Sequence, residues 1–427
     1  MYLCTPGTIA QLVEQRTENP CVPGSNPGST TKKDHLVIFF FLQLHQTPTG
    51  ELRPNRLSSF TSAQRLSMKQ KQNKQNITSE FLTSLLPNAT KSGEVLKSRG
   101  FVLCDDAFQI LPPPAKHTEL LMKLPIHWIR GGEQCKSIAK AQEVWRWLEA
   151  SGANRFDTII VIGGGTVMDL GAFVATTYKR GVKFILMPTT LLGMVDASIG
   201  GKNGINFNGV KNSIGSFNKP TNVCVDVEWI NTLPTAELLN GWMELSKHAL
   251  ISDPSLWEEL QTKTPVDEGI DWDQIVRRGT DIKQRIVDAD FYEQGERKQL
   301  NFGHTIGHAL ESLAARDGMA LDHGFAVGIG MIASLHWSAQ SVDEIANQKS
   351  ILKAASALRR LLKTDANCDT WNWCVQQSPQ QLWPFMLKDK KNQSNTVLDI
   401  RLREIGSAEW DCPLTQIDFE TFWKVAF

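Results

Sequence analysis

The sequence lacks the patterns that indicate a disulfide framework, a structural zinc site or a membrane span. Its eight cysteines are scattered over 427 residues and no pair has metal-ligand spacing, so free thiols in a reducing, cytoplasmic compartment are expected. The apolar run LVIFFFLQL is nine residues, too short to span a bilayer, and no short basic region precedes it as in a signal peptide. Net charge is also absent, with 45 basic against 45 acidic residues, so neither nucleic acid nor membrane is expected as a partner.

The first hundred residues carry no chemistry that the sequence identifies. Residues 5–32 are rich in Pro, Gly, Ser, Thr and Asn without periodicity, which predicts disorder. Residues 52–79 contain Arg, Lys and Ser but no acid, so they fit either an organelle transit peptide or an extension from an upstream start codon. The second interpretation is favoured, with Met68 as the natural beginning. Residues 1–67 are expected to be dispensable for folding and activity, and residues 68–99 to be a poorly defined lead-in.

From Gly100 onward, short apolar segments alternate with helical patterns. GFVLCDD, IHWIRGG, FDTIIVI and VKFILMP are short and rich in β-formers, as buried parallel strands are. Their alternation with helices through Asp226 predicts a parallel sheet with right-handed crossovers. After INTLP, where Pro234 interrupts the pattern, the sequence becomes helical. The predicted fold class is an α/β domain over residues 100–235 followed by an all-α, or mainly helical, domain over residues 236–427.

Three glycines, Gly163–Gly165, separate the strand FDTIIVI from a helical pattern. A strand, a glycine turn and a helix N-terminus can present backbone N–H groups to phosphate. The full GxGxxG fingerprint is absent, however, and an ordinary tight turn explains the motif equally well. A loop after the next strand holds Gly200 and Gly201, which permit close approach of the backbone. The same loop offers groups that suit a polyanionic ligand: Asp196, Lys202, Lys211 and Asn212.

The segment LNFGHTIGHALE, residues 300–311, places His304 and His308 one helical turn apart on the same face. His323 follows in LDHGF, and Glu244 precedes them in GWMELSKHALI. Two imidazoles and one carboxylate with an open position are the ligand set of a catalytic divalent metal, zinc or a close relative. Such histidine pairs also occur as ordinary packed or surface residues, so the spacing alone does not decide.

Several motifs together resemble the 3-dehydroquinate synthase family. PTTLLGMVDASIGGK, GVKN, MELSKHALI, LNFGHTIGHALE and DHG stand in the family's order at compatible spacing, and the resemblance extends from about Gly100 to about Gly406. The wider group is the sugar phosphate cyclases, which are NAD-dependent metalloenzymes. The resemblance implies a Rossmann-like parallel-sheet domain followed by a helical domain. It also implies a sugar acid phosphate as substrate, and NAD and one divalent metal, zinc or cobalt, as cofactors.

The resemblance also assigns roles to the residues that match the family's motifs. The metal ligands would be Glu244, His304 and His323. Cofactor contacts would come from Asp105, Glu133, Lys136, Gly165, Asp169, Thr189, Thr190, Asp196, Lys202, Lys211, Trp229 and Thr232. Substrate binding and catalysis would fall to Lys202, Lys247, Lys283, Arg297, Asn301, Asn212, Arg180, Lys390 and His308. Taken singly, Glu133 and Asp169 also suit acids in the first turn of a helix, and a loop lysine is usually a solvated charge; the several matches in order favour the family roles.

Individual side chains explain some of these assignments. The planar fork of Arg297 can donate two parallel hydrogen bonds to a substrate carboxylate. His308, one turn from His304, would carry a proton or contact phosphate. Arg180 resembles an arginine that reaches into the site of the partner subunit, so a homodimer is implied.

The implied reaction converts 3-deoxy-D-arabino-heptulosonate 7-phosphate to 3-dehydroquinate by oxidation, elimination of phosphate, reduction and aldol closure. Three positions depart from the family pattern: Met168 replaces a glycine, Asn203 a threonine and Phe325 an acid. They fit lineage drift, a different sugar phosphate substrate, or a weakened enzyme. The other functions to consider are another cyclase, a glycerol dehydrogenase or iron alcohol dehydrogenase, which lack the lysine-rich loop, and a non-catalytic homologue.

Overall fold

The computed structural model describes residues 99–110, 123–388 and 396–427. The expectations for the N-terminal extension, for Met68 and for Lys390 therefore lie outside the described residues. Within the described ranges no helix is both long enough and apolar enough to cross a bilayer.

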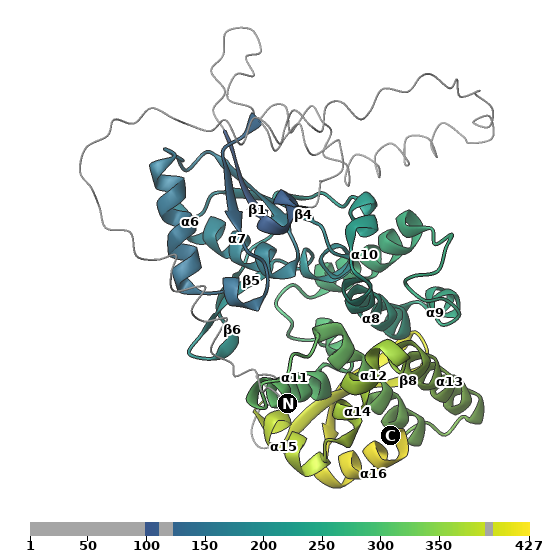
Figure 1. The fold of residues 1–427 in the computed structure, drawn as a ribbon. Coiled ribbons are helices and arrows are strands. Elements are labelled where there is room, and N and C mark those ends of the chain that lie inside the picture. Colours follow the sequence, from purple (N-terminus) through teal and green to yellow (C-terminus); the bar gives the residue numbers. More distant parts are fainter. Residues whose placement is uncertain (1–98, 111–122, 389–395) are drawn as a thin grey trace, which may run out of the picture. The chain divides into compact units, whose positions relative to one another are not determined.

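Five short strands form a parallel sheet in the order β2-β1-β3-β4-β7. Figure 1 labels two of them, β1 and β4. Alternate residues of the central strands enter different cores: Phe101, Ile159 and Phe184 lie in one buried cluster, and their neighbours in another. This alternation is what a sheet covered on both faces requires. The strands are β1 (Gly100–Asp105), β2 (Ile126–Ile129), β3 (Thr158–Gly163), β4 (Lys183–Pro188) and β7 (Asn222–Val223).

Two helices and a hairpin complete this first region. Ser137 caps α6 (Ile138–Ala150) by accepting a hydrogen bond from the N–H of Lys140, and α7 (Gly165–Thr177) packs against β3 and β4. After β4 the chain makes the π-helical turn η4 (Gly193–Ala197) and then an antiparallel hairpin of β5 (Lys202–Phe207) and β6 (Val210–Phe217). The segment predicted as one lysine-rich loop is therefore the turn η4, the glycine pair Gly200–Gly201 and this hairpin, which carries Lys202, Lys211 and Asn212.

Helices dominate the chain from Thr235 onward. The central one, α12, is buried on nearly every side, as expected of a helix that is apolar all round, and it packs against α8, α11, α13 and α16. The helices are α8 (Thr235–Ser252), α9 (Pro254–Leu260), α10 (Trp272–Ala289), α11 (His304–Arg316), α12 (His323–Gln340), α13 (Ile345–Leu362), α14 (Cys368–Gln376), α15 (Pro379–Leu387) and α16 (Gln416–Ala426).

One antiparallel hairpin interrupts the helical region near its end. Its strands are β8 (Val397–Glu404), which lies against α12 and α13, and β9 (Ser407–Leu414), which lies against α8. The predicted parallel-sheet domain followed by a helical region is confirmed, with this hairpin as an addition that makes the second region mostly rather than entirely helical.

Candidate active site

Three helices bring together the three side chains predicted to bind metal. Glu244 comes from the middle of α8, while His304 and His323 are the first residues of α11 and α12. Oε1 of Glu244 lies 3.5 Å from Nε2 of His304 and 3.4 Å from Nε2 of His323. The three donor atoms lie within 4.8 Å of one another, which is the arrangement of a cation site.

Small residues allow these helices to approach closely enough. A Cβ placed on Gly330 of α12 would come within 2.0 Å of the carbonyl oxygen of Gly303, which precedes α11. A Cβ on Gly324 would lie 2.5 Å from the backbone of Asn240 in α8. Side chains at these two contacts would therefore force the helices apart and separate the three ligands.

The hydrogen bonds around the cluster leave the atoms that face its centre available to a divalent cation. Glu244 is fully buried, and its Oε1 makes no hydrogen bond within the described part of the chain, which is costly for a carboxylate unless a cation binds there. Nδ1 of His304 lies 3.3 Å from the carbonyl oxygen of Phe302 and can donate to it, so Nε2 remains the metal-binding nitrogen. Burial lowers the pKa of His323, but the carboxylates of Glu244 and Glu311 outweigh this and raise it to about 10. The cluster thus stabilises positive charge, and the residues fit a metal.

Glu311, in the same motif as His304 and His308, lies against the predicted ligand His323 and was not predicted as a site residue. Its Oε2 lies 3.5 Å from Nδ1 of His323, and its Oε1 accepts a hydrogen bond from Nζ of Lys211 at 3.1 Å. Burial would raise the pKa of Glu311, but His323 and Lys211 lower it to about 2. The sequence did offer one signal for Glu311: it stands three residues after His308, and residues at this spacing lie on the same face of a helix.

Replacing Glu311 by Gln is expected to weaken metal binding by roughly 10- to 100-fold, because a carboxylate behind a ligand histidine fixes its tautomer and raises its basicity. Competition with a chromogenic chelator measures this affinity without any need for turnover. Glu258→Gln, at an exposed position of α9, is the matched control and should bind metal like the unaltered protein. Equal affinity in both variants would show that Glu311 does not orient His323.

A buried cluster of charges adjoins the three ligands. Nζ of Lys247 pairs with Oε2 of Glu244 and lies 3.9 Å from Oδ1 of Asp196, while Nζ of Lys283 lies 2.7 Å from that same oxygen. Both lysines are almost fully buried. Burial would raise the pKa of Asp196, but the two ammonium groups hold it well below its usual range, and burial lowers the pKa of Lys283. His248 also borders the cluster, with Nε2 3.4 Å from Asp196 Oδ1.

Predicted cofactor residues meet at the carboxyl edge of the parallel sheet. Asp105 ends β1, Gly163–Gly165 connect β3 to α7, and Thr189 and Thr190 follow β4. A Cβ on Gly131 would lie 2.4 Å from Asp105 Oδ2, so the carboxylate packs directly on the glycine turn after β2. The open edge of such a sheet, beside a helix N-terminus, is where dinucleotides bind in this class of fold.

A second group of predicted residues forms one hydrogen-bonded set beside α7. Nζ of Lys136 donates to Asp169 Oδ2 at 2.7 Å and also to Asn212 Oδ1. Glu133 joins through Asn206, whose Nδ2 donates to Glu133 Oε1 at 2.7 Å and whose Oδ1 accepts from the N–H of Asn212 at 2.9 Å. Asn206 was not predicted, because nothing in the sequence indicates that a hairpin residue contacts the turn after β2.

The segment between α10 and α11 packs against the glycine pair Gly200 and Gly201. Arg297 is buried and donates to the carbonyl oxygens of Phe291 at 2.5 Å and Gly200 at 3.1 Å. Gly200 has a φ of +105°, and a Cβ there would meet the guanidinium at 2.3 Å. A side chain at position 200 is therefore disfavoured both by the backbone conformation and by the clash with Arg297.

Glu293 is a second residue beside the predicted site that no sequence pattern indicated. Its carboxylate pairs with Nζ of Lys202 and accepts a hydrogen bond from Asn301 Nδ2 at 2.6 Å. Burial would raise the pKa of Glu293, but Lys202 and Asn301 lower it. The backbone of Glu293 is left-handed, with a φ of +60°, a conformation that no local sequence signal predicted.

The remaining predicted residues lie in varied settings. The Trp229 side chain is buried with its ring 4.6 Å from that of Phe108, and Thr232 donates to the carbonyl oxygen of Trp229 at 2.7 Å; their cofactor role stays a prediction. His308 lies beside the ligands, its ring centroid 5.3 Å from that of His304. Arg180 is exposed at the end of the turn Tyr178–Arg180.

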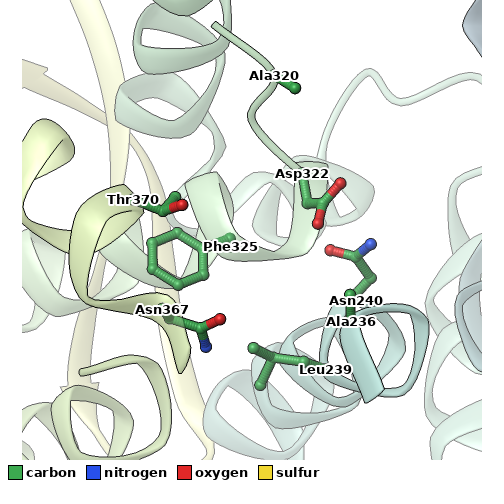
Figure 2. A pocket seen from close by; sticks show the side chains of 8 residues that line it. All are labelled: Ala236, Leu239, Asn240, Ala320, Asp322, Phe325, Asn367 and Thr370. Atoms are coloured by element: carbon green, nitrogen blue, oxygen red, sulfur yellow. The ribbon is translucent and has the colours of Figure 1, made fainter. Parts of the chain in front are cut away.

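The three departures from the family pattern are buried. Met168 packs in α7 against Gly193, and Asn203 accepts a hydrogen bond from Ser216 at 3.1 Å. Phe325 lines a pocket beside the start of α12, together with Asp322 and Asn240 (Figure 2). Asn240 Oδ1 accepts a hydrogen bond from the N–H of Gly324 at 3.1 Å, and Asn367 and Thr370 line the pocket opposite, so Phe325 faces a pocket among α8, α12 and α14.

The family models and the curated relatives that match this chain agree on one family. The model described as 3-dehydroquinate synthase N-terminal matches residues 126–240, and 3-dehydroquinate synthase C-terminal matches residues 241–392. The 3-dehydroquinate synthase of Streptococcus sanguinis is 36% identical over 282 residues, 65% of this chain and 76% of that protein. That of Pyrococcus abyssi is 44% identical over 206 residues, 48% of this chain and 60% of that protein, which is less than two thirds of its length.

A solved structure shares the fold. The 2-epi-5-epi-valiolone synthase of Streptomyces hygroscopicus, solved with NAD+ and Zn2+ bound, superposes with a TM-score of 0.64 at 24% identity. The alignment covers 79% of this chain and 93% of that one. At this identity the likeness concerns the fold alone.

Proposed function

The chain belongs to the 3-dehydroquinate synthase family, and we propose that it converts 3-deoxy-D-arabino-heptulosonate 7-phosphate to 3-dehydroquinate and phosphate. This is a carbon–oxygen lyase reaction of the shikimate pathway, which supplies aromatic amino acids. The observation that carries the proposal is the buried Glu244 carboxylate, which faces Nε2 of His304 and of His323 and has a buried lysine cluster beside it. A cation site next to fixed positive charge suits a substrate that is both a ring alcohol and a polyanion.

Two cofactors belong to the proposal. Glu244, His304 and His323 would hold one divalent cation, zinc or cobalt, which when bound polarises an alcohol or ketone as a Lewis acid. Asp105, the glycine turn after β3, Lys136, Asp169, Thr189 and Thr190 are the residues proposed to hold NAD, which accepts and returns a hydride.

The protein's own side chains bind and orient the substrate in this proposal. Arg297 has five N–H donors, and two main-chain carbonyls fix its guanidinium, so it can hold the substrate carboxylate at little cost in side-chain entropy. Asn301 and Lys283 would contact ring hydroxyls and the carboxylate, and Lys202 would bind phosphate. The partner of Lys202 here is Glu293, so an incoming phosphate competes with a carboxylate for the ammonium group.

His308 is proposed as the group that carries a proton or contacts phosphate beside the metal ligands, from which its ring is separated by 5.3 to 6.2 Å between centroids. Lys247, Lys211 and Asn212 would add further contacts with substrate and cofactor phosphates. We also propose a cytoplasmic homodimer in which Arg180 of one subunit completes the site of the other, because Arg180 is exposed on its own subunit.

Substoichiometric NAD is expected to support many turnovers of the keto acid phosphate, because the hydride taken from the substrate is returned within the same turnover. Purified protein is incubated with substrate, and phosphate release is followed together with the absorbance of NADH. Phosphate should accumulate with no lasting NADH signal. Glycerol and other simple polyols, as control substrates, should give no sustained NADH.

Steady NADH accumulation matched to substrate loss would contradict the proposal in favour of a dehydrogenase. Phosphate release from a different sugar phosphate, with none from the keto acid phosphate, would instead indicate another cyclase. No turnover of either substrate in metal-loaded protein would indicate a non-catalytic homologue.

A further inference from the structure

Three aromatic rings join the base of the β5–β6 hairpin to the loop after α10. The ring centroid of Phe217, in β6, lies 5.9 Å from that of Phe291 and 5.6 Å from that of Tyr292, and these two rings are 5.1 Å apart. Phe217 and Tyr292 are 42% and 64% exposed, whereas Phe291 is half-buried and packs against the main hydrophobic core. We call Phe217, Phe291 and Tyr292 the aromatic clasp.

Two clasp residues, Phe291 and Tyr292, directly precede Glu293, the residue with a left-handed backbone. A φ of +60° costs conformational energy in a residue with a side chain, so neighbouring contacts must hold it there. Asp290 supplies part of this support, because its carboxylate accepts hydrogen bonds from the N–H groups of Gln294, Gly295 and Arg297 at 3.0, 2.7 and 3.1 Å. Burial opposes this, but the three bonds leave the pKa of Asp290 below its usual value.

The clasp supplies the other part of the support, from the side of the hairpin. The ring of Phe291 packs on Gly201, where a Cβ would lie 3.1 Å from it, and Nζ of Lys219 lies 5.1 Å from the same ring's centroid. Lys219 also pairs with Asp288 at 3.0 Å. The strand that ends in Phe217 pairs with the one that begins with Lys202, since these two residues are register partners. One end of the hairpin therefore carries both the clasp ring and the lysine that meets Glu293.

We infer that Phe217 and Tyr292 are positioning residues for the proposed reaction: they hold the loop 290–297 against the hairpin so that Glu293 stands between Lys202 and Asn301 before substrate binds. This inference rests on the proposed function for its kinetic meaning. When the loop is already ordered, substrate binding does not have to supply the free energy of ordering it. Loss of the clasp therefore lowers the fraction of protein molecules that can bind substrate. Substrate, once bound to Lys202 and Arg297, can itself keep the loop in place.

The test compares Tyr292→Ala, Phe217→Ala and the double variant with Tyr292→Phe and with Phe156→Ala, an exposed aromatic control in the turn before β3. Tyr292→Ala and Phe217→Ala should each raise KM by roughly 3- to 10-fold, the range of an aromatic ring contact, and leave kcat nearly unchanged. The double variant should raise KM by less than the product of the two single effects, because both single changes remove the Phe217–Tyr292 contact, while each also removes its own contact with Phe291. Tyr292→Phe keeps the ring and should match the unaltered protein.

Hydrogen exchange supplies a readout that does not depend on turnover. The amides of Gln294, Gly295 and Arg297 should exchange faster in Tyr292→Ala and Phe217→Ala than in Tyr292→Phe or Phe156→Ala. Unchanged exchange, effects on KM that add in the double variant, or a fall in kcat at constant KM would each overturn the inference. An inactive unaltered protein would contradict the proposed function alone, and the exchange measurement would still decide whether the clasp holds the loop.

Discussion

Replacing His304 with Ala is expected to remove bound metal and turnover together. The change leaves only Glu244 and His323 at the site, and a site with two protein ligands binds a divalent cation weakly. Activity should fall by at least about a thousandfold, because Lewis-acid polarisation contributes several kcal/mol of barrier lowering. Metal content after dialysis, by mass spectrometry, and phosphate release are the two measurements. Chelation of the unaltered protein should give the same loss, and zinc or cobalt should restore it.

Two other histidines provide controls for this expectation. His308→Ala should keep its metal and lose activity, because His308 is proposed to act on the substrate and not on the cation. His127→Ala, at a β2 position where Nε2 meets Glu143 at 3.2 Å, should keep both. Full activity in metal-free protein, or retention of metal by His304→Ala, would show that Glu244, His304 and His323 are not the metal ligands.

Much of the fold could be predicted because its signals are local. The strand before Gly163–Gly165 is a short apolar run followed by a glycine turn and a helix, and the structure has β3, the turn and α7 there. The pair His304 and His308 was predictable as two residues on one helical face. Spacing could not decide which of the two binds metal, and that choice came from the family resemblance. In the structure Nε2 of His304 is the nitrogen that faces Glu244.

The residues that sequence analysis missed depend on contacts between distant segments. Glu293 meets Lys202, 91 residues away along the chain, through a left-handed backbone that only the surrounding loop can impose. Glu311 stands in the quoted motif, but its use depends on α12 bringing His323 against it. The β8–β9 hairpin is a different case: residues 400–403 and 408–412 alternate apolar and polar side chains, so a local strand signal was present in the sequence.

Lys202→Ala and Arg297→Ala are each expected to lower kcat/KM by at least about 2 kcal/mol of transition-state stabilisation, roughly a 30-fold loss, because each removes a charge-assisted contact with an anionic group of the substrate. The structure separates the two cases. Lys202 is 48% exposed and pairs with Glu293, so its removal should leave the fold and the metal content unchanged. Arg297 is buried and bonded to Phe291 and Gly200, so its removal should also loosen the loop that carries Glu293.

Arg297→Lys distinguishes charge from geometry. A lysine keeps one positive charge but cannot donate in parallel to a carboxylate while also holding two main-chain carbonyls, so most of the loss in kcat/KM should remain. Lys263→Ala, which removes a surface pair with Glu259 on α9, is the control and should have normal kinetics. Circular dichroism and metal content confirm that each variant is folded and loaded. If Lys202→Ala and Arg297→Ala each had near-normal kcat/KM, neither residue would bind the anionic groups of the substrate, because the loss of such a charge-assisted contact lowers kcat/KM.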